Sequence, residues 1–188
     1  MPTRRLALAA VLALPAACAT AVAEAPATDD APDWVPEAYQ LGAGDKVRVT
    51  VFNEPSLTGE FQVSSAGALS LPLIGEVEAA GRTVSELQRA VEAKLRDGYL
   101  LDPRVNAEIL TYRPFYILGE VGAPGTYPYS AGLTVLNAVA TAGGFTYRAN
   151  TGRVYIRRAN ATGEVAYRLT SQTRIAPGDT IRIGERLF

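Results

Sequence analysis

The chain has no histidine and only one cysteine, one methionine and one tryptophan among its 188 residues. Without histidine, neither a Ser-His-Asp triad nor a Cys-His dyad can form, and the common Cys/His zinc sites are excluded as well. Most of the side chains that enzymes use for catalysis are therefore missing. We expect no catalytic residue, no metal site and no cofactor, and we do not expect an enzyme.

The sequence also lacks an excess of positive charge. It has 18 Lys and Arg residues against 19 Asp and Glu residues, which gives a formal net charge of −1. Proteins that bind phosphate backbones carry a basic excess, so we do not expect a nucleic-acid partner. The chain is 48% hydrophobic and 20% charged, which is typical of a folded protein with an apolar core.

One long apolar run is present, and it lies near the N-terminus. Leu6–Ala17 follows Arg4 and Arg5 and contains no charge, as in a secretory signal peptide. A helix of this length spans about 18 Å, which is too short for the ~30 Å hydrocarbon core of a bilayer. We therefore expect secretion out of the cytoplasm and no permanent transmembrane helix.

Two cleavage sites compete after this run. In one interpretation the signal peptide is 1–17 and Cys18 becomes the acylated first residue of a lipoprotein. In the other, the small-x-small sequence Ala21-Val22-Ala23 ends a signal peptide of residues 1–23, and Cys18 is removed with it. Both alternatives place the mature chain in the periplasm. Residues 24–38 are rich in Ala, Pro, Asp and Glu and are expected to form an extended tether.

The first half of the mature chain, residues 39–112, has the patterns of a small α+β unit. Its clearest helix is expected at Val84–Asp97, because Thr83 and Glu86 form a T-x-x-E capping box and apolar residues recur every four positions. Alternating apolar residues and glycine-rich turns predict strands before and after this helix. These strands are expected at Lys46–Phe52, Phe61–Ser64, Ala68–Leu73, Gly75–Ala79 and Arg104–Tyr112.

The second half, residues 113–188, shows a different rhythm after Arg113-Pro114. A short helix is expected at Val135–Thr141, capped by Thr134, and because it is apolar all round it is expected to lie buried across a sheet. Strands are expected at Phe115–Glu120, Thr126–Tyr129, Arg153–Arg158, Val165–Leu169 and Thr180–Ile183, with a hairpin across 160–163. The whole chain is predicted to be a β-rich α+β protein.

One sequence pattern occurs in both halves. Leu41–Val49 and Ile175–Ile183 share the order aliphatic-x-small-Gly-Asp-x-aliphatic-Arg-aliphatic. Gly tolerates a positive φ and Asp can bond its own backbone two residues on, so each copy predicts a turn that begins a strand.

These residues together resemble the outer-membrane polysaccharide export proteins, the Wza-like family. In residues 39–112 the resemblance lies in the Gly44-Asp45 turn, Leu71–Gly75, Gly81-x-Thr83 and Asp102-Pro103, as in the family's export domain. In residues 113–188 it is carried by 118–121, 124–127 and 133–145, which are similar to the soluble-ligand-binding β-grasp (SLBB) module. The resemblance covers about residues 39–183, nearly the whole mature chain.

The resemblance implies a non-catalytic subunit that forms a ring in a capsule or exopolysaccharide export channel. It would be periplasmic and attached to the outer membrane, and the ring would guide polymer to the pore. The implied partners are further copies of the chain, an inner-membrane polysaccharide copolymerase or tyrosine kinase, the exopolysaccharide, and a separate outer-membrane β-barrel. Family members with a C-terminal pore helix differ from this chain, so a short form with one export domain and one SLBB module is expected.

Two other functions stay open from the residues alone. The β-grasp unit could act as a monomeric periplasmic module that senses a soluble saccharide. A carboxylate-dependent hydrolase would need two close acids, for which Glu76 and Glu78 are the candidates, although surface alternation explains both.

Aromatic and basic residues gather in the second half of the chain and are candidates for contact with polymer or partner. Aromatic rings stack on sugars, and arginines attract acidic polymers, although strand packing and surface salt bridges explain such residues equally well. The candidates are Tyr112, Tyr116, Tyr147, Arg148, Arg153 and Arg157.

Overall fold

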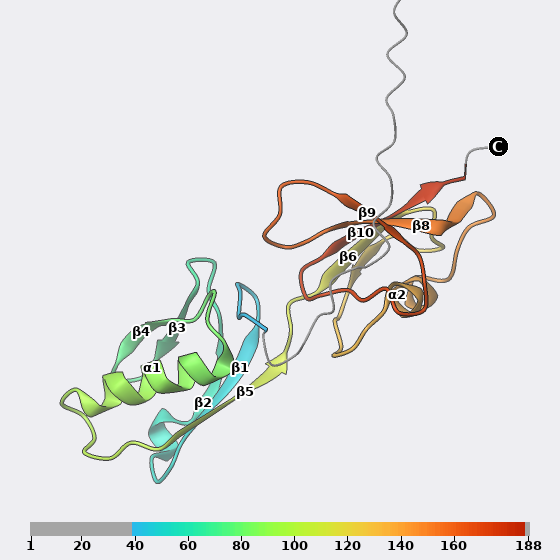
Figure 1. Cartoon of the computed structure of the whole chain (residues 1–188). Helices are drawn as coiled ribbons and strands as arrows, with labels where there is room; N and C mark the ends of the chain where they lie inside the picture. The colour runs from blue at the N-terminus through green and yellow to red at the C-terminus, as the bar shows by residue number, and fades with distance from the viewer. Residues whose placement is uncertain (1–38, 187–188) are drawn as a thin grey trace, which may run out of the picture.

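The computed structural model describes residues 39–186 of the chain. The expected signal peptide, Cys18 and the tether 24–38 lie outside the described residues. The described part folds into two lobes that follow one another along the chain, a first lobe of residues 39–112 and a second lobe of residues 113–186 (Figure 1).

The first lobe is built on a three-stranded antiparallel sheet with the order β2-β1-β5. The central strand β1 (Lys46–Val51) pairs with β2 (Gly59–Gln62) on one side and with β5 (Val105–Thr111) on the other. Side chains of β1 alternate between exposed and buried positions, as the sequence pattern predicted. A short 3₁₀ helix, η2 (Pro55–Leu57), connects β1 to β2.

A helix and a hairpin complete the first lobe. Helix α1 (Val84–Arg96) begins at the predicted capping box, in which the Thr83 side chain and the Glu86 side chain each accept a hydrogen bond from the other's backbone N–H. Leu87, Val91 and Leu95 on its inner face are buried. The hairpin consists of β3 (Ala68–Leu71) and β4 (Gly75–Glu78). Helix, hairpin and sheet enclose one apolar core.

The second lobe is a five-stranded sheet with the order β7-β6-β10-β8-β9. Its central strand β10 (Thr180–Glu185) is parallel to β6 (Phe115–Gly119) and antiparallel to β8 (Ala149–Arg157). The two edge strands pair antiparallel to their neighbours, and β8 forms the predicted hairpin with β9. The edge strands are β7 (Gly125–Tyr127) and β9 (Val165–Arg168).

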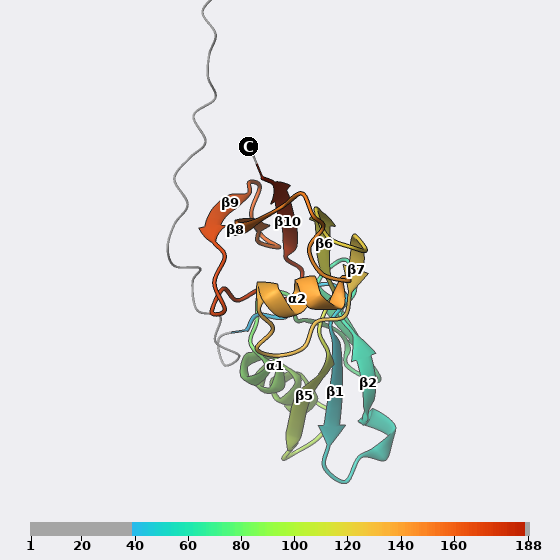
Figure 2. The ribbon, with the colours of Figure 1, turned by 90° about the vertical axis from the view of Figure 1, so that its right-hand side faces the viewer.

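Helix α2 (Val135–Thr141) covers one face of this sheet (Figure 2). Its bounds, its Thr134 cap and its position across a sheet agree with the prediction, but only one side of the helix is buried. Val135, Ala138 and Val139 face the core, whereas Leu136 on the other side is 37% exposed. The sheet contacts one face of the helix, so the residues on the opposite face, including Leu136, remain exposed to solvent.

The prediction of a β-rich α+β chain is confirmed, with small shifts at strand ends. Strand β2 was expected at Phe61–Ser64 and lies at Gly59–Gln62, because Gly59 pairs with Val49 of β1. Strand β3 ends at Leu71, because Pro72 and the next two residues form the turn to β4. The shift of β2 follows from its pairing with β1, and the end of β3 follows from the turn to β4.

Candidate functional site

The repeated Gly-Asp pattern forms two equivalent turns, one in each lobe. Asp45 accepts a hydrogen bond from the backbone N–H of Gly42 at 2.8 Å, and Asp179 accepts one from the N–H of Ala176 at 2.7 Å. Each carboxylate therefore reaches back three residues, where the sequence suggested a bond two residues onward. Gly178 has a φ of 83°, which favours glycine in this turn position.

Both aspartates are buried, so their charge has to be satisfied inside the protein. Asp45 also accepts hydrogen bonds from the Tyr39 hydroxyl at 2.6 Å and from the Arg113 N–H at 2.7 Å. Asp179 is paired with the Arg158 guanidinium. Burial raises the pKa of Asp179, and Arg158 opposes that shift.

Arg113 lies between the two turns and contacts both. Its backbone N–H donates to Asp45, while its Nε donates to the Pro177 carbonyl at 3.1 Å. Its guanidinium carbon lies 5.6 Å from the centre of the Tyr39 ring. A Cβ at Gly42 would lie 1.5 Å from Nη1 of Arg113, so the guanidinium occupies the space above that glycine. This connecting residue holds the two lobes together.

A row of three tyrosines crosses the same junction. The Tyr112 ring packs edge-on against Tyr39 of the first lobe, with ring centres 5.2 Å apart, and against Tyr129 of the second lobe at 5.5 Å. Tyr112 contacts the apolar cores of both lobes. Burial raises the pKa of Tyr129 to about 12, and burial together with the Asp45 carboxylate raises the pKa of Tyr39.

A groove of about 590 Å³ opens beside this junction. Its size lies within the usual range for small-molecule sites. Four of its lining residues are glycines, two are arginines, and the others are apolar or neutral polar residues. The lining residues are Gln40, Leu41, Gly42, Ala43, Gly44, Ala80, Gly81, Arg113, Pro114, Tyr116, Arg157, Ala159, Asn160, Gly178 and Thr180. We call this cavity the interdomain groove.

Three adjacent strands supply one wall of the interdomain groove. Tyr116 of β6 pairs with Thr180 of β10, which pairs with Arg157 of β8, so the three residues form a row across the sheet. The row lies on the face opposite α2, because neighbours such as Ile117 and Ile156 point into the core. The strand register thus brings a tyrosine and an arginine to one site.

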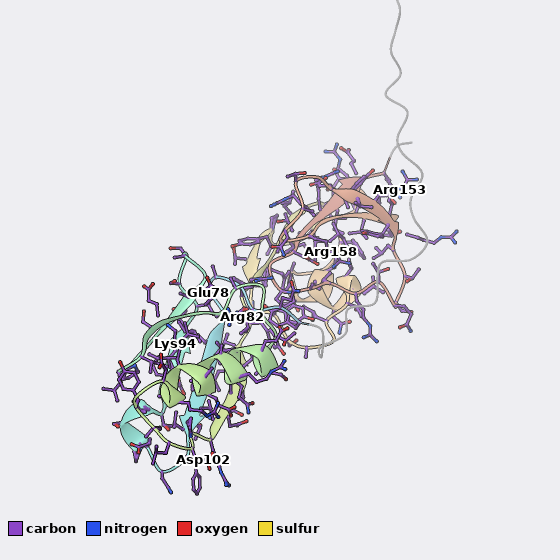
Figure 3. The ribbon with its side chains drawn as sticks, turned by 60° about the vertical axis from the view of Figure 1, so that its left-hand side comes forward. Glu78, Arg82, Lys94, Asp102, Arg153 and Arg158 are labelled. Carbon is purple, nitrogen blue, oxygen red and sulfur yellow. The ribbon has the colours of Figure 1, made fainter. Side chains whose placement is uncertain are left out.

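A smaller cavity of about 200 Å³ adjoins the interdomain groove and shares Gln40, Arg113, Ala159 and Asn160 with it. The Arg158 guanidinium lies here beside Asp179. Its Nη2 is buried and has no hydrogen-bond partner within residues 39–186. Figure 3 shows Arg158 nearer the first lobe and Arg153 farther out on the second.

A third cavity, of about 600 Å³, lies at the far end of the second lobe's sheet. Tyr147 lines it and is 83% exposed, and the Arg182 guanidinium packs over the Tyr155 ring at 3.9 Å. Arg148 is paired with Glu185 nearby, with Nε 2.6 Å from the carboxylate oxygen.

The structure separates the six candidate contact residues into four places. Tyr116 and Arg157 come together in the interdomain groove, whereas Tyr147 and Arg148 lie near the far cavity. Tyr112 packs between the two cores, and Arg153 lies along β8 away from the groove. Arg113 was not among the predicted contact residues, although the two Gly-Asp turns that it connects were evident in the sequence.

The two acidic residues considered for hydrolysis lie on an exposed strand. Glu76 and Glu78 alternate along β4 as expected of a surface strand, and Glu78 is paired with Arg82 at 3.0 Å (Figure 3). No group of three or more acidic, Cys or His side chains within 39–186 is placed to hold a metal ion. In the same range, no helix is long and apolar enough to cross a membrane.

Comparison with known families gives a match for each lobe. Residues 34–110 match the model of the polysaccharide biosynthesis/export proteins, and residues 114–169 match the SLBB domain. The chain belongs to the polysaccharide export family. It carries an export domain, which forms the first lobe, followed by an SLBB domain in the second.

Curated relatives agree with this assignment. The chain is 37% identical over 150 residues to the exopolysaccharide production protein ExoF of Rhizobium meliloti, covering 73% of the chain and 35% of that relative. It is 29% identical over 158 residues to the polysialic acid transport protein KpsD of Escherichia coli, covering 79% and 28%. It is 24% identical over 182 residues to the EPS I polysaccharide export outer membrane protein EpsA of Ralstonia nicotianae, covering 79% and 48%.

The chain spans about a third of the length of ExoF and KpsD. These relatives are named for the production, transport or export of polysaccharide, and none is named as an enzyme.

Proposed function

We propose that this protein is a periplasmic, outer-membrane-associated component of a capsule or exopolysaccharide export channel. Several copies form a ring that guides polymer across the periplasm to an outer-membrane pore. The family match and the names of the relatives support a role in polysaccharide export. The ring and its lumen are proposed from the family resemblance.

The observation that carries this proposal is the tight junction between the two domains. Arg113 bonds both Gly-Asp turns, and Tyr112 packs against both cores. A fixed angle between the domains lets every copy present the same pair of surfaces to its neighbours. Repeated head-to-tail contacts of that kind close into a ring when the rotation per copy divides a full turn.

The proposed partners are an inner-membrane polysaccharide copolymerase or tyrosine kinase, a separate outer-membrane β-barrel and the exopolysaccharide. If Cys18 is acylated, the lipid attaches the chain to the outer membrane. Mass spectrometry of the mature N-terminus distinguishes an acylated Cys18 from a chain that begins at Glu24.

Deletion of the gene tests the export role. We expect loss of surface polysaccharide while cytoplasmic precursors are still made, and restoration of the polymer when the gene is supplied in trans. Normal secretion in the deletion strain would contradict the proposal.

The interdomain groove also favours a second candidate, a monomeric periplasmic module that senses a soluble saccharide. Analytical ultracentrifugation separates the two functions. We expect the mass of several copies at high concentration or with membrane partners, whereas a sensor sediments as one copy under all these conditions.

A further inference from the structure

The two arginines of the interdomain groove lack the acidic partners that other arginines of the SLBB domain have. Arg148 is paired with Glu185, Arg158 with Asp179 and Arg182 with Glu164. Within residues 39–186, neither Arg113 nor Arg157 is in a salt bridge, and no Asp or Glu lines the groove. The guanidinium groups that line the groove are therefore not engaged in direct ion pairs within the described residues.

Both guanidinium groups are held in place by neutral acceptors. Arg157 donates from Nη2 to the Thr180 hydroxyl at 2.9 Å, and Arg113 donates from Nε to the Pro177 carbonyl at 3.1 Å. Each arginine keeps further N–H donors for a ligand. A planar guanidinium matches a carboxylate with two parallel hydrogen bonds, and fixing it in advance lowers the entropy cost of binding.

Tyr116 adds a surface of a different kind to the same wall. Its side chain is 45% exposed, and Thr180 separates it from Arg157 in the cross-strand row. An exposed tyrosine ring offers an apolar face with a polar edge, which suits the faces of a sugar ring. Gln40 and Asn160 supply neutral donors and acceptors around it.

We propose that the interdomain groove binds an acidic sugar residue, with Arg157 and Arg113 holding its carboxylate and Tyr116 packing against its ring. This inference rests on the proposed export function and names the class of polymer, one that contains hexuronic acid or another carboxylated sugar. Because the groove is open to solvent, salt screens the interaction, and each residue of a moving polymer binds weakly and is released.

An NMR titration of the mature chain tests the site directly. The probes are D-glucuronate, neutral D-glucose and acetate, each at the same ionic strength. We expect D-glucuronate to shift the Nε–H signals of the groove arginines and to bind at least tenfold more tightly than D-glucose, since one charge-assisted pair is worth about a factor of ten or more. Acetate is expected to bind more weakly than D-glucuronate, because it has no ring to contact Tyr116.

Three variants and a matched control locate the binding. Arg157→Gln is expected to weaken D-glucuronate binding about tenfold, and Tyr116→Ala severalfold. Gly42→Ala is expected to weaken it as well, because the new Cβ displaces the Arg113 guanidinium. Arg153→Gln, four residues earlier on β8, is the control and is expected to keep the original affinity. The unfolding temperature of each variant reports whether it is folded.

Several results would overturn the inference. Equal binding of D-glucuronate and D-glucose would remove the role of charge, and equal binding of acetate would remove the role of the sugar ring. An equal loss in Arg157→Gln and Arg153→Gln would place binding outside the groove. The purified-protein assay does not depend on ring assembly or secretion, so its failure is separate from failure of the deletion experiment.

Discussion

Gly178 is a residue whose backbone and surroundings both require the absence of a side chain. Its φ is 83°, and a Cβ there would lie 2.7 Å from Nε of Arg113 and 3.0 Å from the Ala159 Cβ. Gly144 has the same φ of 83°, but a Cβ there would have no atom within 4 Å. An alanine at Gly144 would therefore introduce backbone strain alone, whereas an alanine at Gly178 would introduce the same strain together with crowding.

We expect Gly144→Ala to lower the free energy of unfolding by about 1 kcal/mol, the cost of the left-handed conformation for a residue with a Cβ. Gly178→Ala is expected to cost about 3 kcal/mol, because crowding against Arg113 adds to the same strain. Urea denaturation of both variants measures the difference. Equal losses would show that Arg113 moves aside without cost.

Tyr129 makes the stability sensitive to alkaline pH. Its pKa is raised to about 12 by burial, so the folded state keeps the phenol protonated where the unfolded chain ionises it. The stability that comes from the protonated Tyr129 is fully present below the ordinary tyrosine pKa of about 10. It is lost as the pH rises from about 10 to about 12.

We expect Tyr129→Phe to be less stable at pH 7 by about 1 kcal/mol, because the hydrogen bond to the Ile175 carbonyl is removed. Between pH 10 and 12 the variant is expected to lose less stability than the original chain. Denaturation curves across this range test the slope, and an unchanged slope would rule out Tyr129 as its source.

Sequence patterns predict the two Gly-Asp turns but not the residue between them. The turns depend on local chemistry, in which an aspartate bonds the backbone three residues before it. Arg113 contacts partners 68 and 64 residues away in sequence, and no local pattern encodes such distances. The repeat of the turn motif in both halves was the available signal for a shared junction.

At the scale of secondary structure, helix α1 depends on its N-terminal capping box. The Thr83 hydroxyl accepts a hydrogen bond from the Glu86 N–H, and the Glu86 carboxylate accepts one from the Thr83 N–H at 2.8 Å. The hydrogen bonds that the Thr83 N–H and the Thr83 hydroxyl donate to the carboxylate lower the pKa of Glu86. The stability that comes from the ionised Glu86 carboxylate is therefore fully present above the ordinary glutamate pKa. It is lost as the pH falls through the lowered pKa of Glu86.

Thr83→Ala is expected to lower the free energy of unfolding by about 1 kcal/mol at pH 7, and Thr83→Ser to retain most of it. Glu86→Gln is expected to remove part of the stability loss that acid causes below the ordinary pKa of a glutamate. Thermal unfolding followed by circular dichroism measures both effects. A Thr83→Ala variant as stable as the original would show that tertiary packing alone holds the helix start.

The elements differ in how well local sequence predicts them. Helix α1 was predicted to within a residue, because its caps and its apolar face agree. The exposed side of α2 was not predicted, because its apolar composition does not tell which side a sheet will cover. Strand β2 begins two residues earlier than predicted, because its bounds are set by pairing with β1, in which Gly59 lies opposite Val49.

At the scale of the whole molecule, Tyr112 connects the two apolar cores. We expect the described part to unfold in one cooperative transition, with equal calorimetric and van't Hoff enthalpies. Tyr112→Ala is expected to separate it into two transitions, one for each domain. Tyr147→Ala, at an 83% exposed position, is the control and is expected to keep one transition.

Strand β5 of the export domain ends at Thr111, and β6 of the SLBB domain begins at Phe115. Three residues connect the two sheets, and the middle one is bonded on both sides. A force on either sheet is therefore transmitted directly to the other, because no flexible linker separates them. If the polymer slides past one domain, as proposed, its drag would turn both domains together as one rigid body.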